Sequence, residues 1–367
     1  MKNFLPGPTE VHPDVLAQLS KPIIGHHTAE FQELLSQINP RLQWLFATKH
    51  PVFTLTCTAS AAMEAALTNT TGERILILAN GAFGERWLSA ARHFGLSADG
   101  FSLGWSITFN KHEIARLLDR MGYDTLVMVH GESSTGMLNP VEPVADLLKT
   151  RPHVLFILDA VATIGGVPLY MDSSRVDVLV GASQKCLALP PGIVPVGVSK
   201  RALKRSESSR LKGYAHDFTI WQERWEKHQT VATPAIPQLR ALLYQLERIE
   251  NETLQARWER HQRMSERTTQ WALSRGLVPL APQGERLASI SCLSFEDGRK
   301  TTGIVEALAQ KGYWIDDGYG KLKGRTLRIG HLGDWGQSDL EGLLSALDEV
   351  LEEEGRQKTD PSTGEVG

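Results

Sequence analysis

Residues 178–185 read Val-Leu-Val-Gly-Ala-Ser-Gln-Lys, a short apolar segment of strand type that runs into a turn and then a lysine, Lys185. A second segment upstream, Val-Leu-Phe-Ile-Leu at 154–158, ends in an acidic residue, Asp159. The spacing suits two neighbouring strands joined by one short connection, which would bring both side chains to the same edge of a parallel sheet. The pair therefore predicts an α/β fold with an amine and a carboxylate at one sheet edge.

This combination of side chains is typical of pyridoxal phosphate chemistry. A lysine can hold the cofactor aldehyde as a Schiff base, and a carboxylate can keep the pyridine nitrogen protonated, so that the ring accepts electrons from a carbanion. Each residue alone has a simpler interpretation, because Lys185 could be a surface lysine and Asp159 a helix N-cap. Their spacing favours the cofactor role.

Further apolar runs of strand length lie around this region, at 52–56, 75–79, 125–129, 176–180 and 194–198. Helix-like stretches separate the first of them. In one such stretch, residues 112–121, the apolar side chains recur at every third or fourth position. Alternation of strands and helices predicts a mostly parallel sheet that is covered by helices on both faces.

The pattern changes after residues 234–237, which read Pro-Ala-Ile-Pro. Residues 239–273 are expected to form one long helix, followed by a strand at 287–295, a helix at 302–311, a strand at 327–330 and a closing helix at 337–354. At 367 residues, the chain is long enough for two domains. We expect an N-terminal segment (1–15), a large cofactor-binding domain (16–260), a small α+β domain (261–355) and a disordered tail (356–367).

Composition excludes several classes of function. Lys and Arg number 39 against 42 Asp and Glu, and no basic stripe suggests nucleic acid as a partner. No apolar run approaches the roughly 20 residues of a membrane span, and no signal-like segment opens the chain, so we expect a cytoplasmic protein without a membrane partner. The three cysteines, Cys57, Cys186 and Cys292, lack metal-ligand spacing, so neither a metal site nor a disulfide framework is expected.

An ordered set of short motifs makes the prediction more specific. These motifs are Gly-Pro-Thr-Glu at 7–10, Ala-Ala-Met-Glu-Ala-Ala at 61–66, Asn-Gly-Ala-Phe-Gly-Glu-Arg at 80–86, His-Gly-Glu-Ser-Ser-Thr-Gly at 130–136, Asp-Ala-Val-Ala at 159–162, Gly-Ala-Ser-Gln-Lys at 181–185 and Leu-Arg-Ile-Gly at 327–330. Over about residues 5–350, the chain resembles the class V pyridoxal phosphate-dependent aminotransferases, most of all their alanine–glyoxylate and serine–pyruvate branch. The resemblance implies fold type I of these transferases, with a seven-stranded sheet in the large domain.

The resemblance also implies roles at the cofactor ring. Lys185 would form the Schiff base and, once displaced by the substrate amine, move a proton between the substrate Cα and the cofactor. Asp159 would pair with the pyridine nitrogen. Val161 would pack on one face of the ring and Phe83 on the other, where relatives often carry tryptophan.

For the cofactor phosphate, the resemblance implies Thr58, Ala59 and Ser60, at a strand-to-helix junction whose backbone N–H groups suit an anion. Relatives commonly have glycine in place of Ala59, and histidine or threonine in place of Ser60. Thr233 matches a phosphate contact donated by a second subunit, which implies a homodimer with a shared active site. The tyrosine often found three residues earlier is Thr230 here.

Three other residues complete the implied site. Ser133 matches a residue that hydrogen-bonds the cofactor 3′ oxygen, and Gln184 matches one beside the phosphate or the same oxygen. Arg328 would bind the substrate α-carboxylate, because a guanidinium offers a carboxylate two parallel hydrogen bonds. The loop at 24–28, with two histidines, lies where relatives have residues that contact the substrate.

The sequence thus predicts an aminotransferase that moves an amino group from a small amino acid, such as alanine or serine, to a small 2-oxo acid, glyoxylate or pyruvate, by a ping-pong mechanism. A lyase or cysteine desulfurase on the same fold is one alternative, although desulfurases usually have histidine immediately before the lysine, where Gln184 stands here. A non-catalytic aminotransferase-like subunit is another, motivated by Ala59, Ser60, Thr230 and Phe83.

Overall fold

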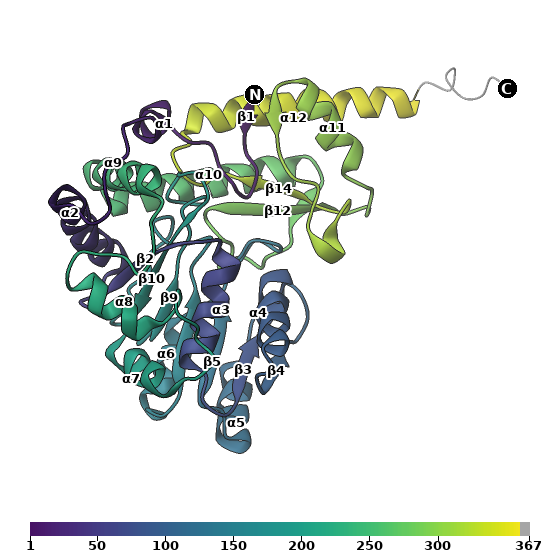
Figure 1. The fold of residues 1–367 in the computed structure, drawn as a ribbon. Helices are drawn as coiled ribbons and strands as arrows, with labels where there is room; N and C mark the ends of the chain where they lie inside the picture. Colours follow the sequence, from purple (N-terminus) through teal and green to yellow (C-terminus); the bar gives the residue numbers. More distant parts are fainter. Residues whose placement is uncertain (360–367) are drawn as a thin grey trace.

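The computed structural model describes residues 1–359, and its centre is a seven-stranded sheet (Figure 1). In spatial order its strands are β2 (Val52–Thr56), β10 (Ile193–Val198), β9 (Val178–Val180), β8 (Leu155–Asp159), β5 (Thr125–Val129), β3 (Ile75–Leu78) and β4 (Ala98–Phe101). Only β10 runs antiparallel to its neighbours. The prediction of a mostly parallel, seven-stranded sheet is therefore confirmed.

Helices cover both faces of this sheet, as the continuous apolar strands predicted. In β3, Leu76 and Leu78 pack into one layer of the core, and Ile75 and Ile77 pack into the other. The first layer is closed by α1 (Pro13–Leu19), α2 (Ala29–Phe46), α5 (Lys111–Met121), α6 (Glu142–Lys149) and α9 (Ile236–Glu252). The second is closed by α3 (Ala59–Thr70), α4 (Ala82–His93), α7 (Lys200–Ser208) and α8 (Phe218–Trp225).

The C-terminal part of the chain builds a smaller sheet with its own core (Figure 1). Its strands are β11 (Leu277–Pro279), β12 (Ile290–Phe295) and β14 (Leu327–Gly330), all antiparallel, and its helices are α10 (Leu254–Ser274), α11 (Thr302–Gln310) and α12 (Gln337–Thr359). A short 3₁₀ turn, η1, covers Gly320–Leu322. This α+β unit agrees with the architecture expected from the sequence.

The N-terminal segment joins this smaller unit. Strand β1 (Lys2–Asn3) pairs in parallel with β13 (Tyr313–Trp314), and the ring of Phe4 stacks on that of Trp335 at 4.4 Å. A second two-stranded ladder, β6 (Gly131–Glu132) with β7 (Met137–Leu138), follows β5 in the large unit. The first residues of the chain are thus packed against residues near its other end.

The single long helix predicted at 239–273 is wrong, because the structure has two helices, α9 and α10. They meet at Thr253, whose φ of 69° cannot continue a right-handed helix, and whose hydroxyl accepts a hydrogen bond of 3.3 Å from the backbone N–H of Ala256. The predicted domain boundary at 260/261 falls inside α10 and stays a prediction. Of the tail predicted at 356–367, the first residues continue α12 to Thr359, and the rest lies outside the described residues.

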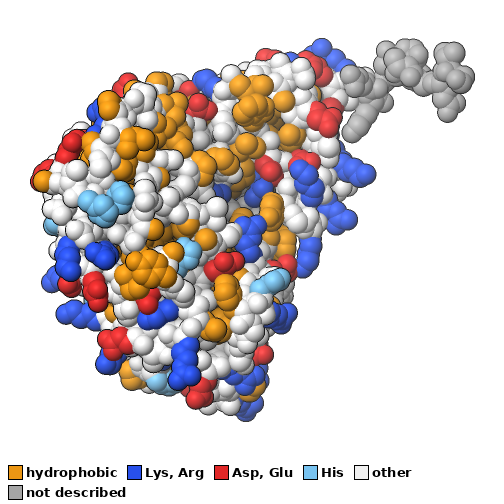
Figure 2. Space-filling view, in the orientation of Figure 1, with side chains coloured by type: hydrophobic (Ala, Val, Ile, Leu, Met, Phe, Trp, Pro, Cys, Tyr) orange, Lys and Arg blue, Asp and Glu red, His pale blue; other side chains and the backbone are white. Residues whose placement is uncertain are grey.

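The surface carries both charges. On the face drawn in Figure 2, basic and acidic side chains are interspersed, with hydrophobic side chains between them. None of the helices in the described part of the chain is both long enough and apolar enough to span a membrane.

Candidate active site

The predicted site residues gather at the carboxyl ends of strands that point the same way. Asp159 ends β8, and Lys185 follows the neighbouring strand β9. Ser133 follows β5, Phe83 follows β3, and Thr58 lies two residues after the end of β2. Ligand sites of open α/β sheets lie at this edge, so the topology gathers residues that are far apart in the sequence.

Lys185 is buried, with 9% of its surface exposed, and its Nζ donates a hydrogen bond to the backbone carbonyl of Pro6. Burial, followed by the positive charge of Arg328, lowers the pKa of the Lys185 ammonium to about 8, although the negative charge of Asp159 acts in the opposite direction. A substantial fraction of the amine is therefore neutral near physiological pH. Such an amine can act as a nucleophile and as a base.

Asp159 is also buried, with 3% exposed, and both its oxygens are oriented. The indole Nε1 of Trp87 donates to Oδ2 at 2.8 Å, and the backbone N–H of Val161 donates to Oδ1 at 2.9 Å. Burial raises the pKa of the carboxyl group, and these two hydrogen bonds and the charge of Lys185 oppose the rise. Each oxygen keeps acceptor capacity for a cationic N–H. Nothing in the sequence indicates this role for Trp87, because it depends on how α4 packs on the sheet.

Phe83 and Val161, predicted to flank the cofactor ring, are both half-buried at this edge. The Phe83 ring stacks on the ring of Tyr319 from the smaller unit, with 5.6 Å between centroids and 15° between planes. The Arg86 guanidinium lies 4.8 Å from the Phe83 centroid and donates a hydrogen bond of 2.6 Å to the Tyr319 hydroxyl. Tyr319, which the sequence analysis missed, thus connects the two units over the site.

A buried carboxylate, Glu132, fixes the turn that carries Phe83. Its Oε2 accepts hydrogen bonds from the backbone N–H groups of Phe83 at 3.0 Å and Gly84 at 3.1 Å, and its Oε1 accepts one from the Ser134 hydroxyl at 2.5 Å. A Cβ at Gly81 would lie 2.3 Å from the Glu132 Cγ, so the turn needs glycine there. Burial raises the pKa of Glu132, and these hydrogen bonds oppose the rise.

The residues expected to bind phosphate lie at the N-terminus of α3. The Thr58 hydroxyl caps this helix by accepting a hydrogen bond of 3.3 Å from the backbone N–H of Ala61. Thr58 is exposed, and Ala59 and Ser60 are half-buried. The helix has 12 residues, so its first turn offers an anion both backbone N–H groups and the positive end of a dipole.

Thr233 is exposed in the loop before α9, and the backbone N–H of Ala235 ties this loop to the Thr56 hydroxyl at 3.1 Å. Within residues 1–359, no hydrogen bond joins Thr233 to Lys185, Asp159 or Arg328. Thr230 donates its hydroxyl to the carbonyl of Ala232 at 2.8 Å.

Arg328 is buried on β14, with 5% exposed, and reaches the large unit. Its Nη1 donates to the backbone carbonyl of Ser133 at 3.1 Å, and its Nε donates to Oδ1 of Asp316 at 2.8 Å. The carbonyl of Gln184 accepts a hydrogen bond of 3.1 Å from the N–H of Thr9. The sequence analysis missed Asp316, because nothing in the spacing indicates that Asp316 and Arg328 are paired.

The chemistry of these groups fits pyridoxal phosphate. A buried amine of lowered pKa suits its aldehyde, a buried and oriented carboxylate suits its pyridine nitrogen, and an accessible helix N-terminus suits its phosphate. The three groups lie on Lys185, Asp159 and α3, along one sheet edge.

The cysteines do not resemble a desulfurase nucleophile. Burial raises the pKa of the Cys57 thiol to about 12, that of Cys186 to about 11 and that of Cys292 to about 12. A thiolate is the reactive form of cysteine, and these values disfavour it.

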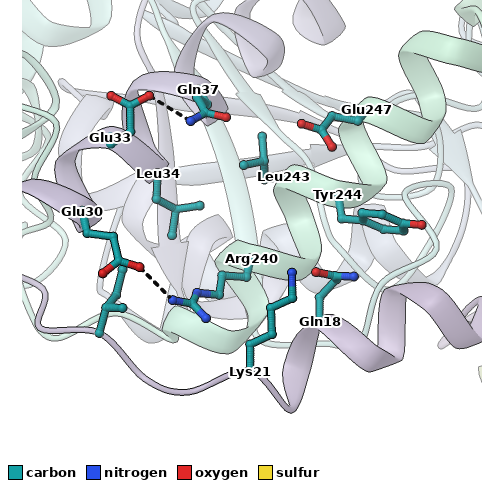
Figure 3. Close-up of a pocket in the computed structure, with 11 residues that line it drawn as sticks. Gln18, Lys21, Glu30, Glu33, Leu34, Gln37, Arg240, Leu243, Tyr244 and Glu247 are labelled. Atoms are coloured by element: carbon teal, nitrogen blue, oxygen red, sulfur yellow. Dashed lines mark hydrogen bonds and ion pairs between the residues drawn. The ribbon is translucent and has the colours of Figure 1, made fainter.

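A pocket of about 420 Å³ lies elsewhere, between α2, α9 and the end of α1 (Figure 3). Arg240 of α9 points toward Glu30 of α2, with 3.2 Å between Nη2 and the carboxylate, and Gln37 bonds Glu33 at 2.9 Å. Ile24, from the loop predicted to contact the substrate, lines this pocket, whereas the predicted catalytic and cofactor-binding residues and Arg328 do not.

Comparison with known proteins is consistent with this geometry. The profile of the aminotransferase class-V family matches residues 17–320. The chain is 32% identical to the soluble hydrogenase small subunit of a Synechococcus strain, across 98% of this chain and 95% of that one. It is 30% identical to the alanine–glyoxylate aminotransferase of Mus musculus, across 95% and 86%. The crystal structure of an alanine–glyoxylate aminotransferase from Nostoc sp. superposes with a TM-score of 0.90, at 28% identity, across 95% and 94%.

Proposed function

Because this chain belongs to the class-V aminotransferase family, we propose that it transfers the amino group of a small amino acid, such as alanine or serine, to glyoxylate or pyruvate in a ping-pong reaction. It is a pyridoxal phosphate-dependent aminotransferase, as the sequence predicted. The observation that carries the substrate proposal is the position of Arg328, a buried guanidinium of β14 whose Nη1 donates to the backbone carbonyl of Ser133, at the cofactor edge of the sheet, at 3.1 Å.

Lys185 would hold the cofactor aldehyde and then move the proton in each half-reaction. Its pKa of about 8 allows Nζ to accept a proton from the substrate Cα and to return one. Burial keeps bulk water from this nitrogen. The proton would therefore pass directly between the substrate Cα and the Lys185 Nζ, without exchange with bulk water.

Asp159 would bind the protonated pyridine nitrogen. When bound, the cofactor supplies the electron sink for the carbanion at the substrate Cα and carries the amino group between the two half-reactions. The hydrogen bonds from Trp87 and Val161 keep the carboxylate fixed and favour its ionised form, which the ion pair requires.

The remaining cofactor contacts follow the resemblance. Phe83 and Val161 would flank the ring, Ser133 would bind the 3′ oxygen, and Gln184 would lie beside it or the phosphate. Their positions after β3, β8, β5 and β9 support these roles.

Thr58, Ala59 and Ser60 would bind the phosphate at the start of α3, and Thr233 would add a contact to the phosphate of a second subunit. The exposure of Thr233 in the loop before α9 leaves its side chain accessible to another copy. This assignment makes the enzyme a homodimer with shared active sites.

We also propose that the enzyme is cytoplasmic. The three cysteines are free thiols, two of them buried, which suits a reducing compartment.

One observation favours the alternative of a non-catalytic subunit, namely that the Synechococcus relative is named as the small subunit of a soluble hydrogenase. The buried amine and carboxylate of this chain favour catalysis instead.

An absorbance experiment separates these two functions. The purified holoenzyme should have a band near about 400 nm that is absent from Lys185→Ala. Alanine or serine should shift the band toward about 330 nm, and glyoxylate or pyruvate should restore it. If no amino acid changes the spectrum of the wild-type enzyme, the aminotransferase proposal fails and the subunit is favoured.

A further inference from the structure

Asp316 lies directly opposite Arg328 in the smaller unit. The backbone N–H of Arg328 donates to the carbonyl of Asp316 at 2.7 Å, and the N–H of Asp316 donates back to the carbonyl of Arg328 at 3.1 Å. Residues paired in this way on antiparallel strands project their side chains to the same face. The backbone therefore delivers a carboxylate to the side of the buried guanidinium.

The turn that follows fixes the direction of this carboxylate. Asp316 Oδ1 accepts hydrogen bonds from the Arg328 Nε and from the backbone N–H of Gly318, both at 2.8 Å. Gly318 has a φ of 101°, and a Cβ there would lie 2.1 Å from the Leu322 carbonyl oxygen. Only glycine suits this turn, so the Asp316 side chain is held by a turn with little freedom.

Arg328 is held on further sides. Its Nη1 donates to the Ser133 carbonyl at 3.1 Å, and the Tyr319 ring lies against the guanidinium, 5.3 Å from its central carbon. A guanidinium has five N–H groups. Within the described chain, Asp316 uses the one on Nε and Ser133 uses one on Nη1, which leaves one on Nη1 and two on Nη2 for a ligand.

We propose that Asp316 is a positioning residue for the substrate α-carboxylate. It binds Arg328 through Nε and thereby directs the Nη1–Nη2 edge toward the substrate, where a carboxylate can form two parallel hydrogen bonds. This inference rests on the proposed role of Arg328 in substrate binding. A guanidinium that is already fixed loses less conformational freedom when the substrate binds.

The opposite role for Asp316 would be that of an internal competitor for Arg328. Two features favour positioning. Asp316 binds the Nε of Arg328 and leaves the Nη1–Nη2 edge to the substrate. Its carboxylate is also held by the backbone N–H of Gly318. The two roles predict changes of opposite sign.

Propionate, which is alanine without the amino group, measures carboxylate affinity without requiring turnover. It is titrated calorimetrically into the holoenzyme of the wild type, Asp316→Asn and Asp316→Ala. Asparagine keeps an oxygen for the Arg328 Nε, so we expect a dissociation constant within about threefold of the wild type, whereas alanine should raise it about tenfold. Asp317→Asn is the matched control, because Asp317 is the next residue and pairs with Lys323 instead.

The reaction supplies a second readout. In single-turnover reactions, Asp316→Ala should raise the alanine concentration needed for half-maximal rate by a similar factor, with little change in the maximal rate. Ethylamine, which lacks the carboxylate, should react with the wild type and the variant alike.

Two results would overturn the proposal: tighter propionate binding in both Asp316 variants, as expected of a competitor, or unchanged binding in both. If instead the wild type fails to react with any amino acid, the proposed function fails, and the propionate titration still reports on Asp316. A folding defect in Asp316→Ala would show as lost cofactor absorbance, in which case Asp316→Asn decides: weaker propionate binding, by up to about threefold, supports positioning, and unchanged or tighter binding overturns it.

Discussion

The indole Nε1 of Trp87 donates a hydrogen bond of 2.8 Å to Oδ2 of Asp159. Trp87 is fully buried on α4, and Asp159 is the last residue of β8, so this bond connects a helix on one face of the sheet to the group that faces the cofactor. The carboxylate is thereby held in place before any ligand binds.

Replacing Trp87 with phenylalanine should lower both the free energy of unfolding and the affinity for the cofactor. The variant keeps an aromatic ring but loses a donor to a buried carboxylate, which costs about 2 kcal/mol. Urea unfolding of the apoenzyme measures this loss, and the dissociation constant of the cofactor should rise as well. Trp105→Phe is the control, because Trp105 makes an equivalent 2.8 Å bond to Glu85 at the surface and should cost under about 0.5 kcal/mol. Equal effects of the two substitutions would contradict this prediction.

Lys185 should make the stability of the apoenzyme depend on pH. Its pKa is lowered to about 8 in the folded protein, so between about pH 8 and 10.5 the unfolded chain binds more protons, and the wild type gains stability as the pH rises. Relative to Lys185→Met, the free energy of unfolding of the wild type should therefore improve by about 2 kcal/mol between pH 7 and pH 10. Urea titrations at both pH values test this. Lys204→Met, at an exposed lysine, controls for removal of a charge, and a pH-independent difference at Lys185 would refute the assignment.

Substitution of Arg257, which lies outside the site, should lower the free energy of unfolding strongly. It has 1% of its surface exposed, pairs with Glu252 at 2.7 Å and Asp334 at 2.9 Å, and donates to the carbonyl of Cys186, next to Lys185, at 2.7 Å. Arg257→Met leaves two carboxylates without this partner and should cost about 3 to 5 kcal/mol.

The control for this substitution is Arg263→Met on the same helix, where the partner Glu259 is 3.7 Å away and both side chains are exposed. It should change the free energy of unfolding by under about 0.5 kcal/mol. Chemical denaturation of both variants provides the comparison. A small effect at Arg257 would mean that the buried ion pairs contribute little.

Thr253→Gly should stabilise the junction between α9 and α10. Thr253 has φ 69° and ψ 144°, a region that glycine occupies readily and a β-branched residue does not, while the lost helix cap costs only a few tenths of a kcal/mol with glycine. We expect a net gain of about 1 kcal/mol in unfolding free energy. Thr28→Gly is the control. Thr28 caps α2 with a φ of −87°, so glycine relieves no backbone strain there and should lower the free energy of unfolding. A loss at both positions would argue against the prediction.

The features that depend on strand order can be predicted from the sequence. Asp159 and Lys185 can be paired from the sequence because the carboxyl ends of parallel strands share an edge. Six of the seven strands of the central sheet lie within two residues of their predicted bounds, because buried strands are continuously apolar. The edge strand β4 was not located, because its residues, Ala-Asp-Gly-Phe, form no apolar run.

Partners set by tertiary packing could not be predicted in the same way. Nothing in the sequence sets Trp87 or Asp316 apart, because each acquires its role from a side chain that only the folded chain brings near. The break at Thr253 was missed for a related reason. Threonine has a modest helix propensity and does not by itself end a helix, so the left-handed conformation reflects the packing of α9 and α10.

The pairing of residues 2–4 with a segment more than 300 positions later constrains the order in which the protein can fold. Residues 2–3 pair with 313–314, the Phe4 carbonyl accepts the N–H of Gly330, and the Pro6 carbonyl contacts Lys185. During synthesis, residues 2–4 must therefore wait until residues 313–330 have been made before these partners exist. Because Arg328 lies in the same late segment, the active site cannot be complete until that part of the chain has been made.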